Sequence, residues 1–450
     1  MSLADTPPEE HRNDRHGSRP TAAPPQRAVV VDPRIGPASA LARSDGARLE
    51  EAVGLAQAIA LDVVVAQTVG LHKIRPNTFF GSGVVERLKQ AVEQHQLNLT
   101  IVNAKLSPVQ QRNLEQALAC KVIDRTGLIL EIFGERARTH EGRLQVELAA
   151  LSYQRSRLVR SWTHLERQRG GFGFLGGPGE SQLEIDRRLI GERIVKLKRE
   201  LEEVRRTRDL QRHGRRKAAL PVIALVGYTN AGKSTLFNRL TQAQVFAKDL
   251  LFATLDTTMR AIELPSGRQA VLSDTVGFIA DLPTDLVAAF RATLEEVVEA
   301  DIVVHVRDMA HADSEAQRQD VEDVLSTIGV GEKVLSGEII EAMNKIDQLD
   351  PVARRRLESG KREGNATARI PISALTGEGV DDLLAAIEAR LAAADAAVAL
   401  DVPLSDGASL AWLYRHGRVV ERHDDDAMAH LTVVLDSESQ ARFAARQRQG

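Results

Sequence analysis

The sequence predicts an α/β protein built from several domains, and three observations support this prediction. In two separate stretches, short runs of β-branched residues alternate with amphipathic helical patterns, an order typical of parallel sheets covered by helices. Between these stretches the chain has no strand pattern and carries apolar residues at helical spacing. The 450 residues are also too many for one hydrophobic core.

The first stretch follows a short tail. Residues 1–27 are rich in proline and charge, and they are predicted to form a disordered tail. Residues 28–140 are predicted to form a parallel α/β domain, in which Ser107 and Pro108 suit the start of a helix. The strands are expected at Val29–Val31, Val63–Val65, Leu99–Val102 and Lys121–Ile123, and the helices at Arg48–Ala60, Val84–His95 and Ser107–Ala119.

Residues 141–218 are predicted to form a long antiparallel helical hairpin. Apolar residues recur there at spacings of three and four in two segments, which is the pattern of helices packed along a heptad seam. A glycine-rich segment, 170–179, joins the two. Residues 143–217 contain 19 Lys and Arg against 10 Asp and Glu, a difference of +9. This charge indicates either a solvated face or a nucleic-acid surface, and the glycines either a flexible joint or a binding tip.

The second stretch begins with a phosphate-binding pattern. An apolar run at Pro221–Val226 leads into a glycine-rich loop and then an amphipathic helix, which is the context of a P-loop. The glycines let backbone N–H groups surround phosphates, the Lys233 ammonium meets the β- and γ-phosphates, and the Ser234 hydroxyl ligates Mg²⁺. The candidate residues are Gly227, Tyr228, Thr229, Asn230, Ala231, Gly232, Lys233, Ser234 and Thr235.

The base is predicted from a second motif at 344–347, which follows an apolar stretch. The Asp347 carboxylate can accept hydrogen bonds from N1–H and the 2-amino group of guanine, which adenine does not offer. Asn344 is expected to tie this loop to the P-loop, and Lys345 to cover the ring. The nucleotide is therefore GTP or GDP. The candidate base-binding residues are Asn344, Lys345, Ile346 and Asp347, together with Ser373, Ala374 and Leu375, whose N–H groups can meet the guanine oxygen.

Two further segments are expected to complete the nucleotide site. At the end of the run Gln269–Ser273, Asp274 can hold Mg²⁺ through water and the Gly277 N–H can meet the γ-phosphate. In the segment 251–258, Thr254 is the candidate second Mg²⁺ ligand. The residues assigned to catalysis are Lys233, Thr254, Asp274 and Gly277, and the further nucleotide contacts are Phe252, Ala253, Leu255, Asp256, Thr275 and Val276.

These motifs in this order resemble the translation-factor-like GTPases, and four more segments resemble the HflX family of ribosome-associated GTPases. The resemblance covers about 28–395. It implies a protein that engages the large ribosomal subunit, in a family of which some members split stalled or stress-inactivated ribosomes, and it places the family's Mg²⁺ threonine at Thr254. The chain departs from the family pattern at Arg307 and Glu341, charged residues in strands expected to be apolar. The four segments are Thr139–Gly142, Trp162–Arg167, Gly176–Glu180 and Gly227–Asn230.

The complete prediction has four folded parts. They are an N-terminal parallel α/β domain, a long antiparallel helical hairpin, a P-loop GTPase domain with a mostly parallel sheet over 219–397, and a small C-terminal α+β domain over 398–450. A single cysteine, Cys120, excludes an internal disulfide framework and a cysteine-cluster zinc site, and the net charge of -3 excludes a uniformly basic coat protein. No apolar run approaches the ~18 residues of a membrane span. We therefore expect a cytoplasmic protein without membrane insertion.

Hydrolysis is expected to be slow in the isolated protein. In many GTPases a glutamine after the Asp-x-x-Gly motif positions the attacking water, but here that residue is Phe278, which can neither donate nor accept. No arginine lies between Asp274 and Phe290, so stimulation is expected from a partner. A K⁺ ion held by the Asn230 side-chain oxygen would supply compensating charge; alternatively, Asn230 only braces the loop.

Three functions remain open from the residues alone. The first is a GTPase that binds rRNA of the large ribosomal subunit through about 143–217 and is a monomer when free. The second is a GTP-dependent switch for a protein partner without RNA, because the heptad seam can pair with another helix. The third is an ATP-using remodeller of RNA or ribosomes. The family resemblance favours the first.

Overall fold

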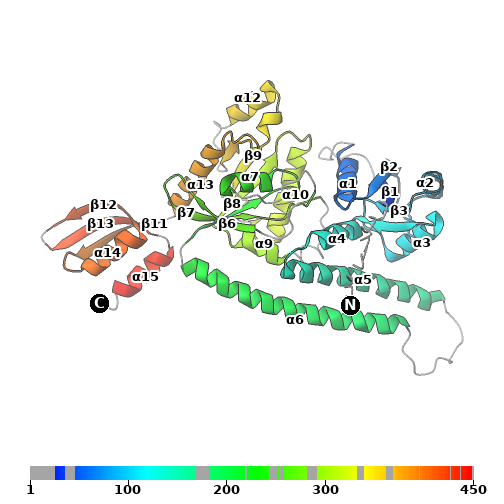
Figure 1. Cartoon of the computed structure of the whole chain (residues 1–450), viewed down its shortest axis with the longest axis horizontal. Coiled ribbons are helices and arrows are strands. Elements are labelled where there is room, and N and C mark those ends of the chain that lie inside the picture. Colours follow the sequence, from blue (N-terminus) through cyan, green and yellow to red (C-terminus); the bar gives the residue numbers. More distant parts are fainter. Residues whose placement is uncertain are drawn as a thin grey trace, which may run out of the picture.

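The structure, a computed structural model, confirms an α/β protein with two mostly parallel sheets, a helical hairpin and a small C-terminal sheet (Figure 1). The predicted glycine tip and most of the predicted tail, 1–25, lie outside the described residues, and the predicted domain limits stay predictions. No helix among the described residues is long and apolar enough to cross a bilayer. The described residues are 26–35, 46–168, 182–217, 220–242, 251–252, 258–280, 291–331, 339–360, 368–394, 396–425, 427–435 and 437–447.

The first sheet has four parallel strands in the order β2-β1-β3-β4. Successive residues of a strand face opposite sides, and both sides are apolar here, since Val30 and Val31 belong to two different buried clusters. Ser107 caps α3 as predicted, accepting a hydrogen bond from Gln110 N at 3.2 Å. The elements are β1 (Arg27–Ile35), α1 (Ala47–Ala58), β2 (Asp62–Leu71), α2 (Ser82–His95), β3 (Leu99–Val102), α3 (Pro108–Leu118), β4 (Lys121–Asp124) and α4 (Arg125–Arg136).

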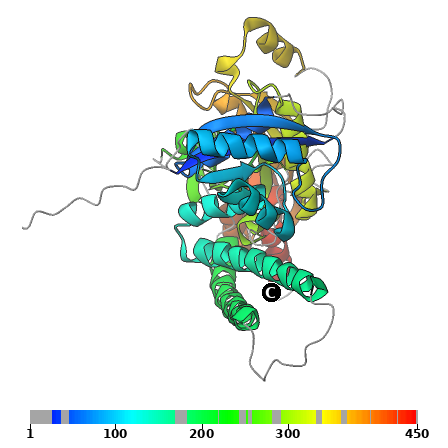
Figure 2. The ribbon, with the colours of Figure 1, turned by 90° about the vertical axis from the view of Figure 1, so that its right-hand side faces the viewer.

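The hairpin consists of α5 (His140–Gln168) and α6 (Gln182–Lys217). The two helices run beside each other below the sheets (Figure 2). Their seam is apolar as predicted, with Leu144 of α5 and Leu197 of α6 buried. At its edge, Arg193 donates to both carboxylate oxygens of Glu147, at 2.7 and 2.8 Å. Because α5 also packs against α3 and α4, the hairpin is attached to the first sheet.

The second sheet has six strands in the order β10-β9-β8-β5-β7-β6, and all neighbours are parallel except β6 and β7. Helices α7 and α13 cover one face, and α9 and α10 cover the other. The elements are β5 (Val222–Val226), α7 (Lys233–Thr241), β6 (Thr258–Glu263), β7 (Gln269–Asp274), α9 (Arg291–Val298), β8 (Ile302–Asp308), α10 (Ser314–Thr327), β9 (Ile340–Asn344), the short 3-10 helix η1 (Ile346–Gln348), α12 (Pro351–Gly360), β10 (Arg369–Pro371) and α13 (Val380–Ala394).

The two unexpected strand charges in this sheet form a buried ion pair. Arg307 of β8 donates to Glu341 of β9 at 3.0 Å, and both side chains are under 10% exposed. Arg307 also donates to Glu315 of α10 at 2.9 Å. A buried charge is tolerated when it is paired in this way. The pairing therefore gives each of these buried strand charges an oppositely charged partner.

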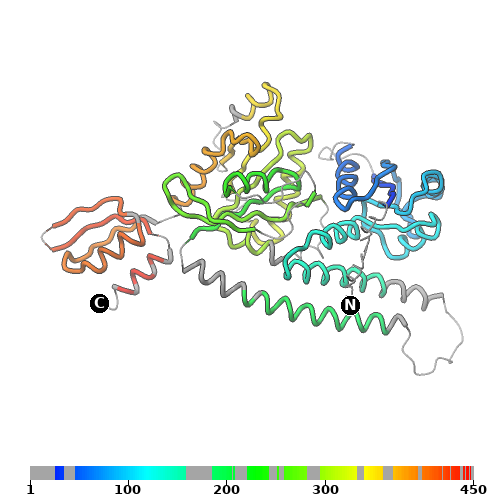
Figure 3. The backbone as a smooth tube through the Cα atoms, in the orientation of Figure 1, coloured from blue at the N-terminus to red at the C-terminus, as the bar shows by residue number. Residues whose placement is uncertain are grey.

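The C-terminal part is a three-stranded antiparallel sheet in the order β11-β13-β12, covered by two helices. It lies beside the second sheet, on the side away from the first (Figure 3). Its elements are β11 (Ala396–Pro403), α14 (Gly407–His416), β12 (Arg418–Asp424), β13 (Met428–Leu435) and α15 (Ser437–Gln447).

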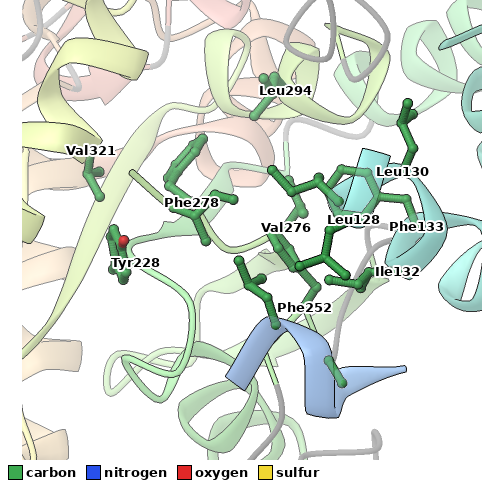
Figure 4. Close-up of a cluster of buried hydrophobic side chains, with 14 of the residues drawn as sticks. Leu128, Leu130, Ile132, Phe133, Tyr228, Phe252, Val276, Phe278, Leu294 and Val321 are labelled. Carbon is green, nitrogen blue, oxygen red and sulfur yellow. The ribbon is translucent and has the colours of Figure 1, made fainter. Parts of the chain in front are cut away.

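One buried apolar cluster joins the first two sheets (Figure 4). The ring of Phe133 in α4 meets the ring of Phe252 edge to face, with 4.7 Å between centroids. Val276 and Phe278, which follow β7, belong to the same cluster. The segment after Asp274 therefore lies at the contact between the N-terminal sheet and the P-loop sheet.

Candidate functional site

The P-loop connects β5 to α7, and its backbone admits only glycine at two positions. Gly227 has a φ of +149°, and a Cβ there would lie 2.2 Å from Val306 O. Gly232 has a φ of +96°, and a Cβ there would lie 2.2 Å from Asn344 Nδ2. Both glycines are therefore required by the backbone angle and by the closeness of the neighbouring strands.

Lys233 begins α7 and turns back into the loop. Its ammonium is buried and donates to Gly227 O at 3.0 Å and to Tyr228 O at 2.9 Å. Burial lowers the pKa of Lys233 to about 8, although the Asp274 carboxylate acts in the opposite direction. Hydrogen bonds from a cation to an anion are stronger than those to neutral carbonyls. Phosphate oxygens are therefore better partners for this ammonium than the two carbonyls it now contacts.

Two oxygen atoms that could ligate a metal lie together beside Lys233. Ser234 Oγ donates to Asp274 Oδ2 at 2.7 Å, and Asp274 is fully buried at the end of β7. Mg²⁺ binds hydroxyl and carboxylate oxygens, commonly through one or two side chains together with phosphates and water. The pair fits such an ion. Thr254, the predicted second ligand, lies outside the described residues, as do Ala253, Leu255 and Asp256.

The Asp-x-x-Gly segment is bonded directly to the P-loop. Thr229 N donates to Phe278 O at 2.7 Å, and Phe278 N donates to Gly227 O at 3.1 Å. A Cβ on Gly277 would lie 2.8 Å from Thr229 Cγ2 and 3.1 Å from Lys233 Nζ, so glycine is needed for this approach. The Phe278 side chain is 1% exposed and packs in the apolar cluster. It therefore offers no group that could position a water.

Two residues outside the predicted site hold this segment from the N-terminal domain. Ala280 N donates to Tyr228 Oη at 2.8 Å, and Arg125 donates to Ala280 O at 2.8 Å. Glu51 of α1 accepts hydrogen bonds from both Tyr228 and Arg125. Sequence reasoning missed Glu51 and Arg125, because Glu51 and Tyr228 are 177 residues apart and no local pattern marks them.

The base-binding candidates meet at the ends of β9 and β10. Asn344 Nδ2 donates to Ala231 O at 2.8 Å, so this side chain does reach the P-loop. Asn344 Oδ1 accepts from Ala374 N at 2.8 Å, which joins the two predicted base loops. Ser373 Oγ donates to Asp347 Oδ1 at 2.6 Å and orients that carboxylate.

Lys345 is held beside these loops in an unusual backbone conformation. Its φ is +66°, in the left-handed region, and such angles in residues other than glycine persist only where the surroundings impose them. Its ammonium donates to Asp308 Oδ2 at 2.7 Å. The ion pair therefore fixes the ammonium end of the Lys345 side chain.

The remaining candidates separate into packing residues and exposed residues. The ring of Phe252 packs on Phe133, in the buried cluster that also holds Tyr228 and Val276, and its contact with the nucleotide stays a prediction. Asn230 is exposed and has a φ of +61°. It lines a cavity of about 270 Å³ between α1 and the P-loop, with Glu50 and Asp308 on its walls. Thr235 is half-buried on α7 and Leu375 is 68% exposed. The buried candidates are Ala231, Thr275, Val276 and Ile346.

Four family profiles match successive parts of the chain. The N-terminal domain of GTP-binding GTPases matches 46–134, and the middle region of the same proteins matches 136–215. A profile described as 50S ribosome-binding GTPase matches 222–345, and one described as HflX C-terminal domain matches 359–448.

Curated relatives match most of the chain. The GTPase HflX of Magnetococcus marinus is 52% identical over 387 residues, which cover 86% of this chain and 88% of that protein. The GTPase HflX of Escherichia coli strain K12 is 47% identical over 358 residues, covering 80% and 82%. Among solved structures, a GTP-binding protein of the archaeon Sulfolobus solfataricus in complex with GDP matches at 24% identity and a TM-score of 0.41, covering 81% of this chain and 98% of that one.

Proposed function

The chain belongs to the HflX family of GTPases and binds and hydrolyses GTP, and from this premise we propose that it acts on the large ribosomal subunit. In the proposed activity, the protein works in the cytoplasm, binds rRNA through the hairpin at about 143–217, and splits or rescues stalled or stress-inactivated ribosomes. Hydrolysis of GTP is stimulated by the ribosome.

The observation that carries this proposal is the basic hairpin. The excess of +9 from 19 Lys and Arg against 10 Asp and Glu is confined to α5, α6 and their connection. Basic side chains supply affinity for phosphates that does not depend on base sequence. Arg187 and Arg188 near the start of α6 are exposed. The matching profile over 222–345 is described as a 50S ribosome-binding GTPase, which supports the same partner.

The site also supports stimulated rather than autonomous hydrolysis. Phe278 takes the position after the Asp-x-x-Gly motif, and its ring is buried in the apolar cluster. Its carbonyl accepts from the Thr229 N–H, a donor of the P-loop. A partner that rearranges this segment would expose that donor and supply the missing group, as in GTPase switches that become ordered on binding.

GTPases of this fold use Mg²⁺. We propose that Ser234 and Thr254 are its protein ligands and that Asp274 holds it through water. The ion would neutralise charge on the phosphates, while Lys233 and the Gly277 N–H bind phosphate oxygens. A K⁺ ion bound by Asn230 is the proposed source of further positive charge. The Asn230 side chain is exposed in the P-loop, which is compatible with that role.

The guanine base is read by two groups in this proposal. Asp347, oriented by Ser373, accepts from N1–H and the 2-amino group. The loop Ser373–Leu375 supplies a backbone N–H to the guanine oxygen. Among its N–H groups, Ser373 N donates to Glu378 O and Ala374 N donates to Asn344. Within the described residues the Leu375 N–H makes no such bond, and it is the donor left for the base.

The test compares two adjacent pairs of exposed arginines. Arg187→Ala with Arg188→Ala should weaken binding to purified large subunits and lower its salt dependence by up to about 0.7–0.9 in log–log slope for each lost phosphate contact. Arg355→Ala with Arg356→Ala on α12 is the matched control and should leave both unchanged. Sedimentation over a range of KCl concentrations measures both quantities.

The alternative functions give different results in the same experiment. Equal binding and equal salt slope for both double variants would contradict rRNA contact by the hairpin. Binding that survives removal of RNA would favour a protein partner. ATP hydrolysis that excess GTP does not inhibit would favour an ATP-using remodeller.

A further inference from the structure

We propose that Arg239, in the last turn of α7, is a positioning residue that sets guanine specificity by orienting the peptide unit between Ala374 and Leu375. This inference rests on the base-reading role proposed above for Asp347 and for the loop Ser373–Leu375. It adds a residue that no motif contains, on the helix that begins with the phosphate-binding Lys233.

Arg239 holds two consecutive carbonyls of the base loop. Its Nε donates to Ala374 O at 2.7 Å, and its Nη2 donates to Leu375 O. A trans peptide unit is planar, and its C=O and N–H point in opposite directions; all peptide bonds among the described residues are trans. Fixing the Ala374 carbonyl therefore fixes the direction of the Leu375 N–H. That N–H is the donor proposed for the guanine oxygen.

The preceding peptide unit, between Ser373 and Ala374, is held as well. Ala374 N donates to Asn344 Oδ1, and Asn344 Nδ2 donates to Ala231 O of the P-loop, both at 2.8 Å. Arg239 and Asn344 thus connect the base loop to the helix and to the loop that bind phosphates. Leu375 is itself 68% exposed, so packing of its side chain cannot fix this loop. Arg239 and Asn344 hold the loop at Ala374 and Leu375, and hydrogen bonds at Ser373 hold its start.

Gly377, which follows this loop, leaves room for the Arg239 guanidinium. Gly377 has a φ of +97°, and a Cβ there would lie 2.6 Å from Arg239 Nη1 and 3.2 Å from its Cζ. The guanidinium is the mobile partner in that clash, so an added methyl group would displace it from Ala374 O. Gly377→Ala is therefore a second route to the same loss, one that leaves Arg239 in the sequence.

The chemistry predicts a loss that depends on the base. Guanine and hypoxanthine both carry the oxygen that the Leu375 N–H would meet, whereas adenine carries an amino group there. Only guanine carries the 2-amino group that Asp347 would read. Loss of Arg239 should therefore weaken GDP and IDP by the same factor, leave ADP nearly unchanged, and preserve the ratio of GDP to IDP affinity.

The experiment measures dissociation constants of GDP, IDP and ADP by competition with a fluorescent GDP on the full chain. For Arg239→Ala we expect GDP and IDP to bind about tenfold more weakly, the loss of hydrogen bonds from a charged donor. Arg239→Lys keeps one donor and should lie between this variant and the wild type. Arg260→Ala, an exposed arginine of β6 at the opposite edge of the sheet, is the matched control and should match the wild type.

A double-variant cycle separates displacement of Arg239 from backbone strain at Gly377. If Gly377→Ala acts by moving the guanidinium, it should lower the GDP-to-ADP preference of the wild type but not of Arg239→Ala. An unchanged GDP-to-ADP preference in Arg239→Ala, or an equal loss for all three nucleotides, would overturn the inference while leaving guanine recognition by Asp347 intact. A wild-type chain with no preference for guanine would overturn the proposed base site, and this inference with it.

Discussion

The contact between Tyr228 and the segment after the Asp-x-x-Gly motif gives a prediction that can be worked out in detail. Tyr228→Phe removes one hydroxyl and keeps the ring in its buried position, where the residue is 5% exposed. The hydroxyl accepts from Ala280 N at 2.8 Å and donates to Glu51. The change therefore leaves a backbone donor without this partner and takes one donor from the Glu51 carboxylate, whose side chain is 9% exposed.

The expected loss of stability follows from these two contacts. A buried donor that loses its partner costs about 1–3 kcal/mol, and a hydrogen bond to a charged group contributes about 1.5–3 kcal/mol. The two losses share one hydroxyl and are not additive, and Arg125 still neutralises Glu51. We expect the free energy of unfolding of the unit formed by the first two sheets to fall by about 2 kcal/mol, measured by urea unfolding.

The functional consequence concerns the choice between GDP and GTP. In the structure Ala280 is held at both its N–H and its carbonyl, and Phe278 O accepts from the P-loop Thr229 N–H. If the Gly277 N–H binds the γ-phosphate as proposed and this segment moves to reach it, a weaker hold should favour the triphosphate. We expect the affinity for a non-hydrolysable GTP analogue, relative to GDP, to rise about 3- to 30-fold, the upper figure corresponding to the full 2 kcal/mol.

Tyr153→Phe is the matched control for this experiment. Tyr153 of α5 donates to the buried Asp124 at 2.6 Å by the same chemistry, but this contact joins the hairpin to the N-terminal sheet and not to the P-loop. Tyr153→Phe should lower the free energy of unfolding by a similar amount and leave the ratio of GTP-analogue to GDP affinity unchanged. The reasoning is refuted if Tyr228→Phe leaves that ratio at the wild-type value, or if both variants shift it equally.

Three further predictions concern the nucleotide site. Asp347→Asn replaces an acceptor of the carboxylate by a donor, so competition assays should show lost preference for GTP and gained binding of xanthosine triphosphate; full retention of GTP preference would show that Asp347 does not read the base. If Asn230 helps bind K⁺, GTP turnover with ribosomes should be faster in KCl than in NaCl, and equal rates would leave Asn230 as a brace of the loop. Because burial lowers the pKa of Lys233 to about 8, and phosphates bind its charged form, GDP affinity should fall by up to about tenfold per pH unit above pH 8; calorimetry showing constant affinity between pH 7 and 9.5 would contradict this assignment.

Local patterns in the sequence were sufficient for the architecture and for the glycines of the P-loop. The strand before Gly227 and the helix after Ser234 are where the pattern predicts them, because a P-loop is a contiguous strand–loop–helix unit. Two further contacts agree with the expected motifs. They are the close approach of Gly277 to the P-loop and the hydrogen bond from Asn344 to Ala231. In each case the residues that meet are close in sequence or belong to a motif of fixed role.

Contacts between distant segments could not be predicted in this way. The packing of the Phe252 ring on Phe133, across the two sheets, is marked by no local pattern. Arg307 and Glu341 looked anomalous singly and are explained only by their pairing in adjacent strands. Nothing in the sequence distinguishes Arg125 from the other arginines near it, and only the fold shows that it contacts Ala280. Each depends on which faces of two domains meet, which a single sequence does not specify.

The central proposal is that this GTPase acts on the large ribosomal subunit. The most direct measurement is sedimentation of the purified protein with purified large subunits in GDP, in a non-hydrolysable GTP analogue, and without nucleotide. If the ribosome stimulates hydrolysis, the triphosphate form must be the one that binds, so co-sedimentation should be strongest with the analogue and should weaken as salt is raised. Absence of co-sedimentation in all three states at low salt, with GTP binding intact, would contradict the account.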